Sequence, residues 1–444
     1  MLSRIRHFLA DVLHWLSSRR WRALAVVVAA LGIAGAVVVG SGIATDDEDD
    51  EATTAPAPDV LVRDVPDAET TEDLGFPAFA TANTTRVAGA DPITNAAAVA
   101  LAVYPATGGV PGPAAVSLVD AADWPSGIAA ASLVAEPIGA PILITDGGEV
   151  PELTANAIDA LGPSGSRATD DRQAFKIGAA AEPEGLETLD VDGSNPAETA
   201  ARVDRLRARL GGEPEHVVLA SSDEPSFAMP AAAWAARSGD PVLFVERNSV
   251  PAPTAAALER YEDVPVYVLG PESAVSADAM REVRKVAPTA TRIAGSDPVS
   301  NAIAFSRFAD GSFGWNINDP GHGLVLANAE RPLDAAAAAP LSATGTWGPL
   351  LVSEDPAAVP AELRGYLLDL KPGYEDDPTR AVYNHAWLIG DTSALDVAFQ
   401  AQVDELIELA PIRSGSGATQ VTPPPGSAEP GAGTSGGQGA GARD

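Results

Sequence analysis

Three sixteen-residue stretches of the chain share one pattern, and this pattern predicts the fold. They read TRVAGADPITNAAAVA from Thr85, LDVDGSNPAETAARVD from Leu189 and TRIAGSDPVSNAIAFS from Thr291. In each stretch a short strand-like run leads through a glycine to Asp-Pro or Asn-Pro and then to an alanine-rich segment. Asp and Asn are good helix N-caps and proline fits the first helical position, so each stretch predicts a strand, a tight turn and a helix. The spacing of about 100 residues gives each repeat enough chain for its own core.

Further apolar runs recur in the same order after each opening stretch. The second runs are AVSLVDAADWP, HVVLASSDEP and GLVLANAERP, and the third are APILITDGGEVP, DPVLFVERNSVP and GPLLVSEDPAAVP. The fourth runs are AFKIG, VPVYVLG and HAWLIG. Short apolar strands that alternate with helices are typical of a parallel sheet covered on both faces. The expected fold class is therefore α/β, with three repeated small parallel-sheet βα units at 84–187, 188–290 and 291–412.

An uncharged apolar segment near the start of the chain predicts a membrane anchor. Residues 23–45 are long enough to cross a hydrocarbon core of ~30 Å. Arginines precede this transmembrane segment and acidic residues follow it, which places the basic segment 1–22 in the cytoplasm and the rest outside. A cleavable signal peptide is the alternative interpretation. The expected location is the cell membrane, single-pass, with the C-terminal bulk extracellular.

The composition defines two flanking segments and excludes several classes of function. Residues 46–83 are acidic and rich in Thr, Ala and Pro, and residues 413–444 are rich in Gly, Ser and Pro, so we expect a disordered linker and a disordered tail. The formal net charge of −33 argues against nucleic acid as a partner. The absence of cysteine excludes disulfides, thiolate zinc sites and cysteine nucleophiles.

The repeated motifs resemble those of the bacterial cell-wall-binding repeat 2 family. Residues 85–91 and 291–297 match its opening Thr-Arg-hydrophobic-x-Gly-x-Asp pattern, and residues 141–146 and 266–270 match its third and fourth strands. The resemblance covers roughly residues 84–412. It implies three α/β units packed about a pseudo-threefold axis, and noncovalent attachment to anionic polymers of the cell envelope.

The chain departs from the family pattern at a position that bears on the ligand. The family's Arg-Tyr after the Asp is replaced by Pro92-Ile93 and Pro298-Val299, which removes basic and aromatic groups. We expect a non-catalytic envelope protein that binds wall polymer or a peptidoglycan-associated glycan. A scaffold that binds other surface proteins is the alternative. A wall-modifying hydrolase is a third hypothesis, with residues 310–323 as the place for its site.

Four residues of the opening stretches are candidate ligand-binding residues. The guanidinium groups of Arg86 and Arg292 can contact a polymer, or they can pair with Asp91 and Asp297 and so join strand to turn. We favour the ion pairs. Asp91 and Asp297 follow strands at the edge where α/β sheets usually bind ligands, and plain helix capping is the expected role of both.

Three further acids occupy equivalent positions in the second runs. Asp123, Asp223 and Glu330 each stand two residues before a proline. If the units pack about a threefold axis, these carboxylates converge and suit a hard cation such as calcium. The expected role is that of solvated turn acids, so no cofactor is predicted and calcium is the single candidate.

The histidines of the repeats do not suggest a catalytic or metal site. They fall far apart, in different units, and none belongs to an HExxH pair. They are His216, His322 and His385.

Overall fold

The computed structural model describes residues 79–87, 89–104, 112–261, 263–343 and 348–412. The predicted membrane span at 23–45 and the predicted tail at 413–444 lie outside these residues, and both stay predictions. Within the described part of the chain, no helix is both long enough and apolar enough to cross a bilayer.

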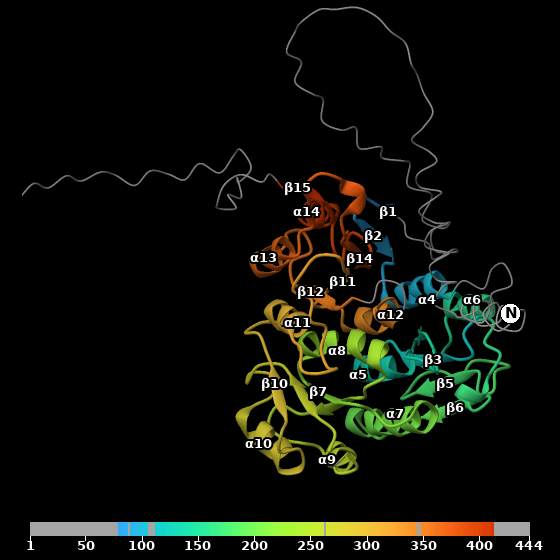
Figure 1. Cartoon of the computed structure of the whole chain (residues 1–444). Helices are drawn as coiled ribbons and strands as arrows, with labels where there is room; N and C mark the ends of the chain where they lie inside the picture. The colour runs from blue at the N-terminus through green and yellow to red at the C-terminus, as the bar shows by residue number, and fades with distance from the viewer. Residues whose placement is uncertain (1–78, 88, 105–111, 262, 344–347, 413–444) are drawn as a thin grey trace, which may run out of the picture.

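Most of the described strands belong to three sheets (Figure 1). Sheet 1 has the order β4 (Ile142–Thr145), β3 (Val116–Asp120), β5 (Ala174–Ile177), β6 (Thr188–Val191). Sheet 2 has the order β10 (Thr291–Ile293), β9 (Val266–Leu269), β7 (Val217–Ser221), β8 (Val242–Val245). Sheet 3 has the order β1 (Phe79–Ala80), β2 (Thr84–Val87), β14 (His385–Ile389), β11 (Gly323–Asn328), β12 (Leu350–Ser353).

All pairings in these sheets are parallel except that of β1 with β2. The central strands β3 and β7 are buried along their whole length, as the continuous apolar runs predicted. The predicted α/β class with repeated βα units is therefore confirmed. A short parallel pair adds β13 (Gly373–Tyr374) and β15 (Ala410–Pro411).

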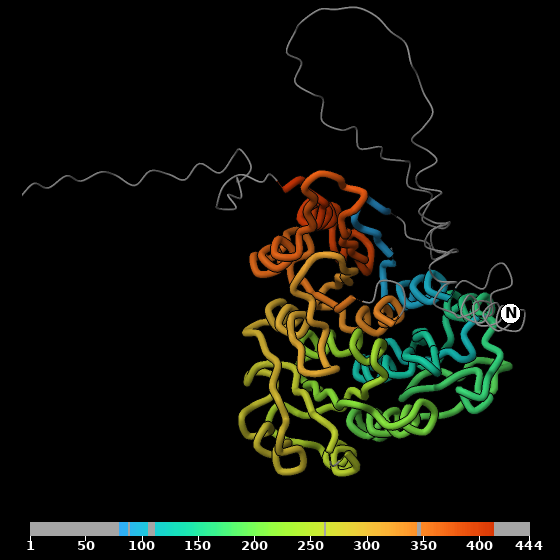
Figure 2. The backbone as a smooth tube through the Cα atoms, in the orientation of Figure 1, coloured from blue at the N-terminus to red at the C-terminus, as the bar shows by residue number. Residues whose placement is uncertain are grey.

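The opening strand of each sequence repeat completes the sheet of the preceding unit. β6 opens the second repeat but pairs with β5 of sheet 1, and β10 opens the third repeat but pairs with β9 of sheet 2. β2 opens the first repeat and pairs with β14, near the end of the described chain. Figure 2 shows this contact, where the blue N-terminal tube runs beside the orange C-terminal segments. The sheets are thus offset by one strand from the sequence repeats, and the N-terminal strand closes a ring of three units.

Three equivalent helices connect neighbouring units. They are α4 (Pro92–Val103), α7 (Pro196–Gly211) and α11 (Pro298–Arg307). α4 leaves sheet 3 and packs on β4 of sheet 1, and α7 leaves sheet 1 and packs on β8 of sheet 2. α11 leaves sheet 2 and packs on β12 of sheet 3 in the same manner. Each connection therefore repeats one arrangement around the ring.

A second set of equivalent helices fills the centre of the molecule (Figure 1). They are α5 (Trp124–Ala130), α8 (Pro225–Ser238) and α12 (Pro332–Ala343), and each one packs against the other two. Alanine dominates the buried faces of α8 and α12, so the backbones approach closely. A Cβ atom at Gly127 of α5 would lie 2.9 Å from Leu333 Cδ2 and 3.0 Å from Ala336 Cβ. The small residues of the sequence therefore serve this central packing.

The remaining helices cover the outer faces of the sheets or follow their last strands. They are α6 (Glu152–Leu161), α9 (Ala252–Leu258), α10 (Ala277–Val286), α13 (Ala361–Asp369) and α14 (Val397–Ile407), with short 3-10 turns at Ala131–Leu133, Arg167–Thr169 and Pro378–Arg380.

The end of the predicted linker is part of the fold. Phe79–Ala80 forms β1, and the hydroxyl of Thr81 and the backbone N–H of Asn83 both donate to the Asp404 carboxylate in α14. The prediction of disorder over 46–83 is therefore wrong for residues 79–83, because these backbone and side-chain groups find partners in a distant helix. The rest of the linker lies outside the described residues.

The glycines of the opening stretches are required by close approach of the following helix. A Cβ atom at Gly89 would lie 2.4 Å from Asn95 Oδ1, and one at Gly193 would lie 2.4 Å from the Thr199 backbone nitrogen. A Cβ atom at Gly295 would lie 2.2 Å from the carbonyl carbon of Ser300. All three glycines are therefore fixed by contact rather than by a left-handed backbone.

We expect Gly295→Ala to destabilise the protein by roughly 1–3 kcal/mol, because the new methyl group overlaps backbone atoms that cannot move alone. Gly365→Ala is the matched control, since Gly365 lies in α13 with no atom within 4 Å of an added Cβ. There alanine favours the helix by roughly 0.5–1 kcal/mol. Urea unfolding of the two variants measures the difference, and equal midpoints would contradict the close-approach explanation.

Candidate functional site

A pocket of about 380 Å³ opens between the units of sheets 1 and 3, at the carboxyl ends of their strands. Its wall combines Asp91 after β2, Ala122 and Trp124 after β3, and Glu330 and Arg331 after β11. We call it the inter-unit pocket. This is the edge at which parallel α/β sheets usually bind ligands, because the connecting loops leave a crevice there. The structure thus brings together two of the predicted site residues, Asp91 and Glu330.

The carboxylate of Asp91 caps the helix that starts at the pocket. Its Oδ1 accepts a hydrogen bond from the Thr94 backbone N–H at 2.9 Å. Asn195 caps α7 and Asp297 caps α11 in the same way, and in α11 the Ser300 hydroxyl completes a capping box. The capping role expected of Asp91 and Asp297 is therefore what their geometry provides.

A buried charge network lies beneath the pocket. Asp334 of α12 is 0% exposed, and its Oδ1 accepts a hydrogen bond from the Asn95 side-chain amide at 2.9 Å. The Arg331 Nε lies 2.8 Å from Asp334 Oδ2. Burial raises the pKa of Asp334 to about 6, although the nearby guanidinium of Arg331 opposes this shift. The network fixes Arg331 at the pocket wall, where its charge offsets the neighbouring carboxylates.

The raised pKa of Asp334 predicts a pH-dependent contribution to stability. A group whose pKa is higher in the folded state stabilises that state when protonated, and this contribution is lost as pH rises through the folded pKa. We expect the free energy of unfolding of the wild type, relative to Asp334→Asn, to fall by up to ~3 kcal/mol between pH 4 and pH 7. Urea titrations of both proteins at several pH values measure this difference. If the difference in unfolding free energy between the two proteins does not change with pH, the raised pKa of Asp334 is contradicted.

Arg86 has a structural position that the sequence did not specify. Its side chain is 2% exposed, and it donates to Gln400 Oε1 and to the carbonyl oxygens of Gly390, Asp391 and Asp396. Burial lowers the pKa of Arg86 to about 10, so the group stays charged at neutral pH. The predicted ion pair with Asp91 is wrong, because the guanidinium binds the backbone that leads into α14.

Arg292 makes the same kind of contact one unit earlier. It donates to the carbonyl oxygens of Gly270 and Val275, in the turn between β9 and α10, and not to Asp297. The second repeat has Leu189 at this position, and there the connection from β5 to β6 contains no helix within the described residues. An arginine therefore occurs in the two units whose last-but-one strand is followed by a turn and a helix, and its guanidinium holds that turn in place.

The three acids proposed for calcium do not assemble into a metal site. Asp123 caps α5 by accepting from the Ser126 backbone N–H, and Asp223 accepts from the Arg247 backbone N–H. Glu330 lines the inter-unit pocket. Across the described ranges, no group of three or more His, Asp or Glu side chains is placed to hold a metal ion. The convergence considered as the alternative is not found among the described residues, because Asp123 and Asp223 bond to backbone N–H groups and Glu330 lies in the pocket wall.

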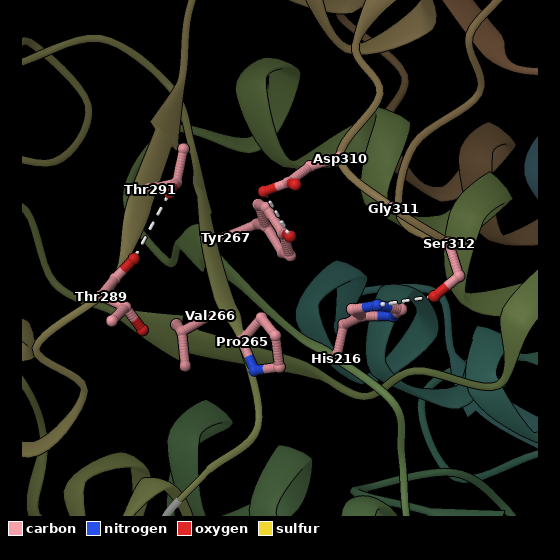
Figure 3. A pocket seen from close by; sticks show the side chains of 9 residues that line it. All are labelled: His216, Pro265, Val266, Tyr267, Thr289, Thr291, Asp310, Gly311 and Ser312. Atoms are coloured by element: carbon pink, nitrogen blue, oxygen red, sulfur yellow. Dashed lines mark hydrogen bonds between the residues drawn. The ribbon is translucent and has the colours of Figure 1, made fainter.

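An arrangement around His216 was not predicted from the sequence, and Figure 3 shows its contact with Ser312. The ring lies between Asp240, just before β8, and Ser312, in the 310–323 segment of the third repeat. Ser312 and His216 are 96 residues apart and belong to different units. The unusual length of the 310–323 segment was the signal in the sequence, but nothing there indicated which side chains it meets.

Comparison with known proteins supports the resemblance seen in the sequence. The model of cell wall binding domain 2 (CWB2) matches residues 191–280, which confirms the resemblance over that segment. No curated protein matches. Among solved structures, Cwp6 from Clostridium difficile has a TM-score of 0.59 and 18% sequence identity, and the match covers 74% of this chain and 48% of that one. Cwp8 from Clostridium difficile has a TM-score of 0.57 and 17% identity, covering 74% and 52%. The chain thus spans about half the length of these structures, which share its fold.

Proposed function

We propose that the protein binds a glycan polymer of the cell wall through the inter-unit pocket. The observation that carries wall binding is the match of residues 191–280 to a cell wall binding domain. The pocket, whose lining residues lie outside that segment, is chosen for its position at the carboxyl ends of the strands. The repeated connections and the three central helices support a pseudo-threefold arrangement of the units. In this proposal the apolar segment 23–45 anchors the protein and residues 79–412 are displayed outside the cell.

The chemistry of the pocket suits a hydroxyl-rich ligand. The carboxylates of Asp91 and Glu330 can accept hydrogen bonds from sugar hydroxyls, and the guanidinium of Arg331 can donate to ring or acyl oxygens. The half-buried indole of Trp124 provides an apolar face at the same wall. A single sugar unit in the pocket would therefore contact hydrogen-bond donors, hydrogen-bond acceptors and a flat apolar surface.

The acidic character of the protein predicts how binding responds to salt. With a formal net charge of −33, approach to an anionic wall polymer costs Coulomb energy, which salt screens. We expect moderate salt or added calcium to strengthen binding to purified wall sacculi. Pull-down of the full-length protein in mild detergent between ~50 and ~200 mM salt measures this dependence. A steep loss of binding over that range would instead indicate basic residues that neutralise phosphates.

The scaffold alternative predicts a different result in the same assay. A scaffold for other surface proteins would not sediment with sacculi from which protein has been stripped. It would sediment only when those proteins are present. The pull-down therefore separates the two functions directly.

A further inference from the structure

Ser312, His216 and Asp240 form a hydrogen-bonded chain, of which Figure 3 shows Ser312 and His216. The Ser312 Oγ lies 3.2 Å from His216 Nε2, and His216 Nδ1 lies 3.1 Å from Asp240 Oδ2. Asp240 is 2% exposed and His216 is 7% exposed, whereas Ser312 faces solvent. A hydroxyl, an imidazole and a buried carboxylate in this order are the parts of a serine nucleophile with its base and orienting acid.

The carboxylate of Asp240 is held in position by other donors. Its Oδ1 accepts from the His216 backbone N–H at 3.0 Å, and its Oδ2 accepts from Trp234 Nε1 at 2.8 Å. The His216 ring packs edge-on against Phe313, with ring centroids 5.2 Å apart. With Nδ1–H donating to Asp240, the lone pair of Nε2 is directed at the Ser312 hydroxyl, which also lies 3.4 Å from Glu215 Oε2. The imidazole is therefore oriented to remove the hydroxyl proton.

Ser312 is presented at the tip of a two-residue turn. Asp310 and Phe313 exchange backbone hydrogen bonds of 2.9 and 3.0 Å, which leaves Gly311 and Ser312 at the tip. Gly311 has φ +62°, in the left-handed region. Within the described part of the chain, the backbone N–H groups of Gly311 and Ser312 make no hydrogen bond to another backbone carbonyl, and both residues are exposed. Such N–H groups beside a nucleophile can stabilise a developing oxyanion.

Two pockets of about 360 Å³ each meet at this hydroxyl, and both include His216 and Ser312 in their walls. One is lined by Pro265, Val266 and Tyr267, and its surface is more apolar. The other contains Arg207 and Arg237 and is polar. The apolar side suits a short acyl group and the polar side suits a hydroxyl-rich alcohol.

We propose that this is a serine esterase site that hydrolyses short acyl esters of a polar alcohol such as a sugar. His216 takes the proton of Ser312 Oγ as the oxygen attacks the ester carbonyl, and then gives it to the departing alcohol. Water loses a proton to His216 and attacks the acyl group on Ser312. The acid leaves and Ser312 recovers its proton, so one ester and one water yield one acid and one alcohol. This activity does not depend on wall binding at the inter-unit pocket.

The absence of cysteine allows a test that needs no substrate. Ser312→Cys introduces a single thiol, and Ser164→Cys introduces one at an exposed loop as the matched control. The charged groups that line the two pockets around His216 are Glu213, Glu215, Asp240, Asp310, Arg207 and Arg237.

An imidazole that pairs with a thiolate lowers the thiol pKa from ~8.5. We expect iodoacetamide to alkylate the thiol of full-length Ser312→Cys about tenfold faster than that of Ser164→Cys at pH 6. Adding His216→Gln to Ser312→Cys should remove the advantage. Equal rates at the two positions would overturn the proposal.

Hydrolysis is tested on the full-length protein with p-nitrophenyl acetate and with glucose pentaacetate. We expect Ser312→Ala to lower kcat/KM by at least ~100-fold, and Ser164→Ala to leave it unchanged. Because Ser312 is exposed, circular dichroism should report an unaltered fold. A wild-type rate no greater than that of Ser312→Ala would overturn the proposal, even if the introduced thiol is reactive. Wall pull-down in the same preparations separates this result from failure of the wall-binding proposal.

Discussion

A chain that begins at Gly89 is expected to lose the cooperative fold of its third unit, whereas a chain that begins at Phe79 retains it. The first lacks β1 and β2, so β14 becomes an open edge and the carbonyl groups around Gly390 lose Arg86. Buried strand area, ladder hydrogen bonds and a buried guanidinium are removed together. We expect a loss of more than ~5 kcal/mol, since removal of the guanidinium costs roughly 3–5 kcal/mol and the strand area and the ladder hydrogen bonds each cost about 1–3 kcal/mol more.

Limited proteolysis and hydrogen exchange over β14 and α14 measure this loss. A synthetic peptide of residues 79–91 should restore protection when added to the shorter chain, and the same peptide with Arg86→Ala should not. Equal resistance of the two chains would contradict closure of the ring by the N-terminal strand.

Arg86→Ala in the full-length protein is the second change with a large expected effect. The guanidinium makes four hydrogen bonds to interior acceptors, and its removal leaves three carbonyl oxygens without this donor. We expect a loss of roughly 3–5 kcal/mol of stability. Arg292→Ala should cost less, because that guanidinium donates to two carbonyl groups and is less buried.

Arg281→Ala is the control, since Arg281 is exposed and pairs with the exposed Asp278. Exposed pairs of this kind contribute about 0–1 kcal/mol. Wall binding, measured well below the unfolding temperature, should be unchanged in all three variants. Reduced binding by Arg86→Ala with unchanged stability would show that this residue serves the ligand instead.

The sequence predicted those parts of the fold that depend on local patterns. The caps Asp91, Asn195 and Asp297 stand before proline at the start of a helix, and each accepts the expected backbone hydrogen bond. The continuous apolar runs form buried parallel strands, because a run without alternation suits a sheet covered on both faces.

The sequence did not predict which sheet each opening strand joins. A repeat of about 100 residues has the same sequence pattern whether its first strand pairs within its own unit or with the preceding unit. The pairing is decided by the connecting helices, which carry the chain across to the next unit. This choice depends on packing between units, which a pattern within one repeat does not encode.

Some site residues were predicted from the sequence and others were not, because their partners are backbone groups or lie in another unit. The partners of Arg86 are mainly backbone carbonyl groups, which every residue has and no sequence pattern marks. Ser312 meets His216 only because the 310–323 segment reaches back over the second unit. Asp91 and Glu330 share a pocket because β2 and β11 end at the same edge of sheet 3.

Wall binding by a variant with a blocked inter-unit pocket tests the central claim most directly. Ala122 is exposed and lines the pocket, so Ala122→Trp fills it without disturbing the core. Ala160→Trp places the same side chain on the exposed face of α6 as the control. We expect sedimentation with purified sacculi to fall at least tenfold for Ala122→Trp and to stay at the wild-type level for Ala160→Trp. Undiminished sedimentation of folded Ala122→Trp would contradict binding at this pocket.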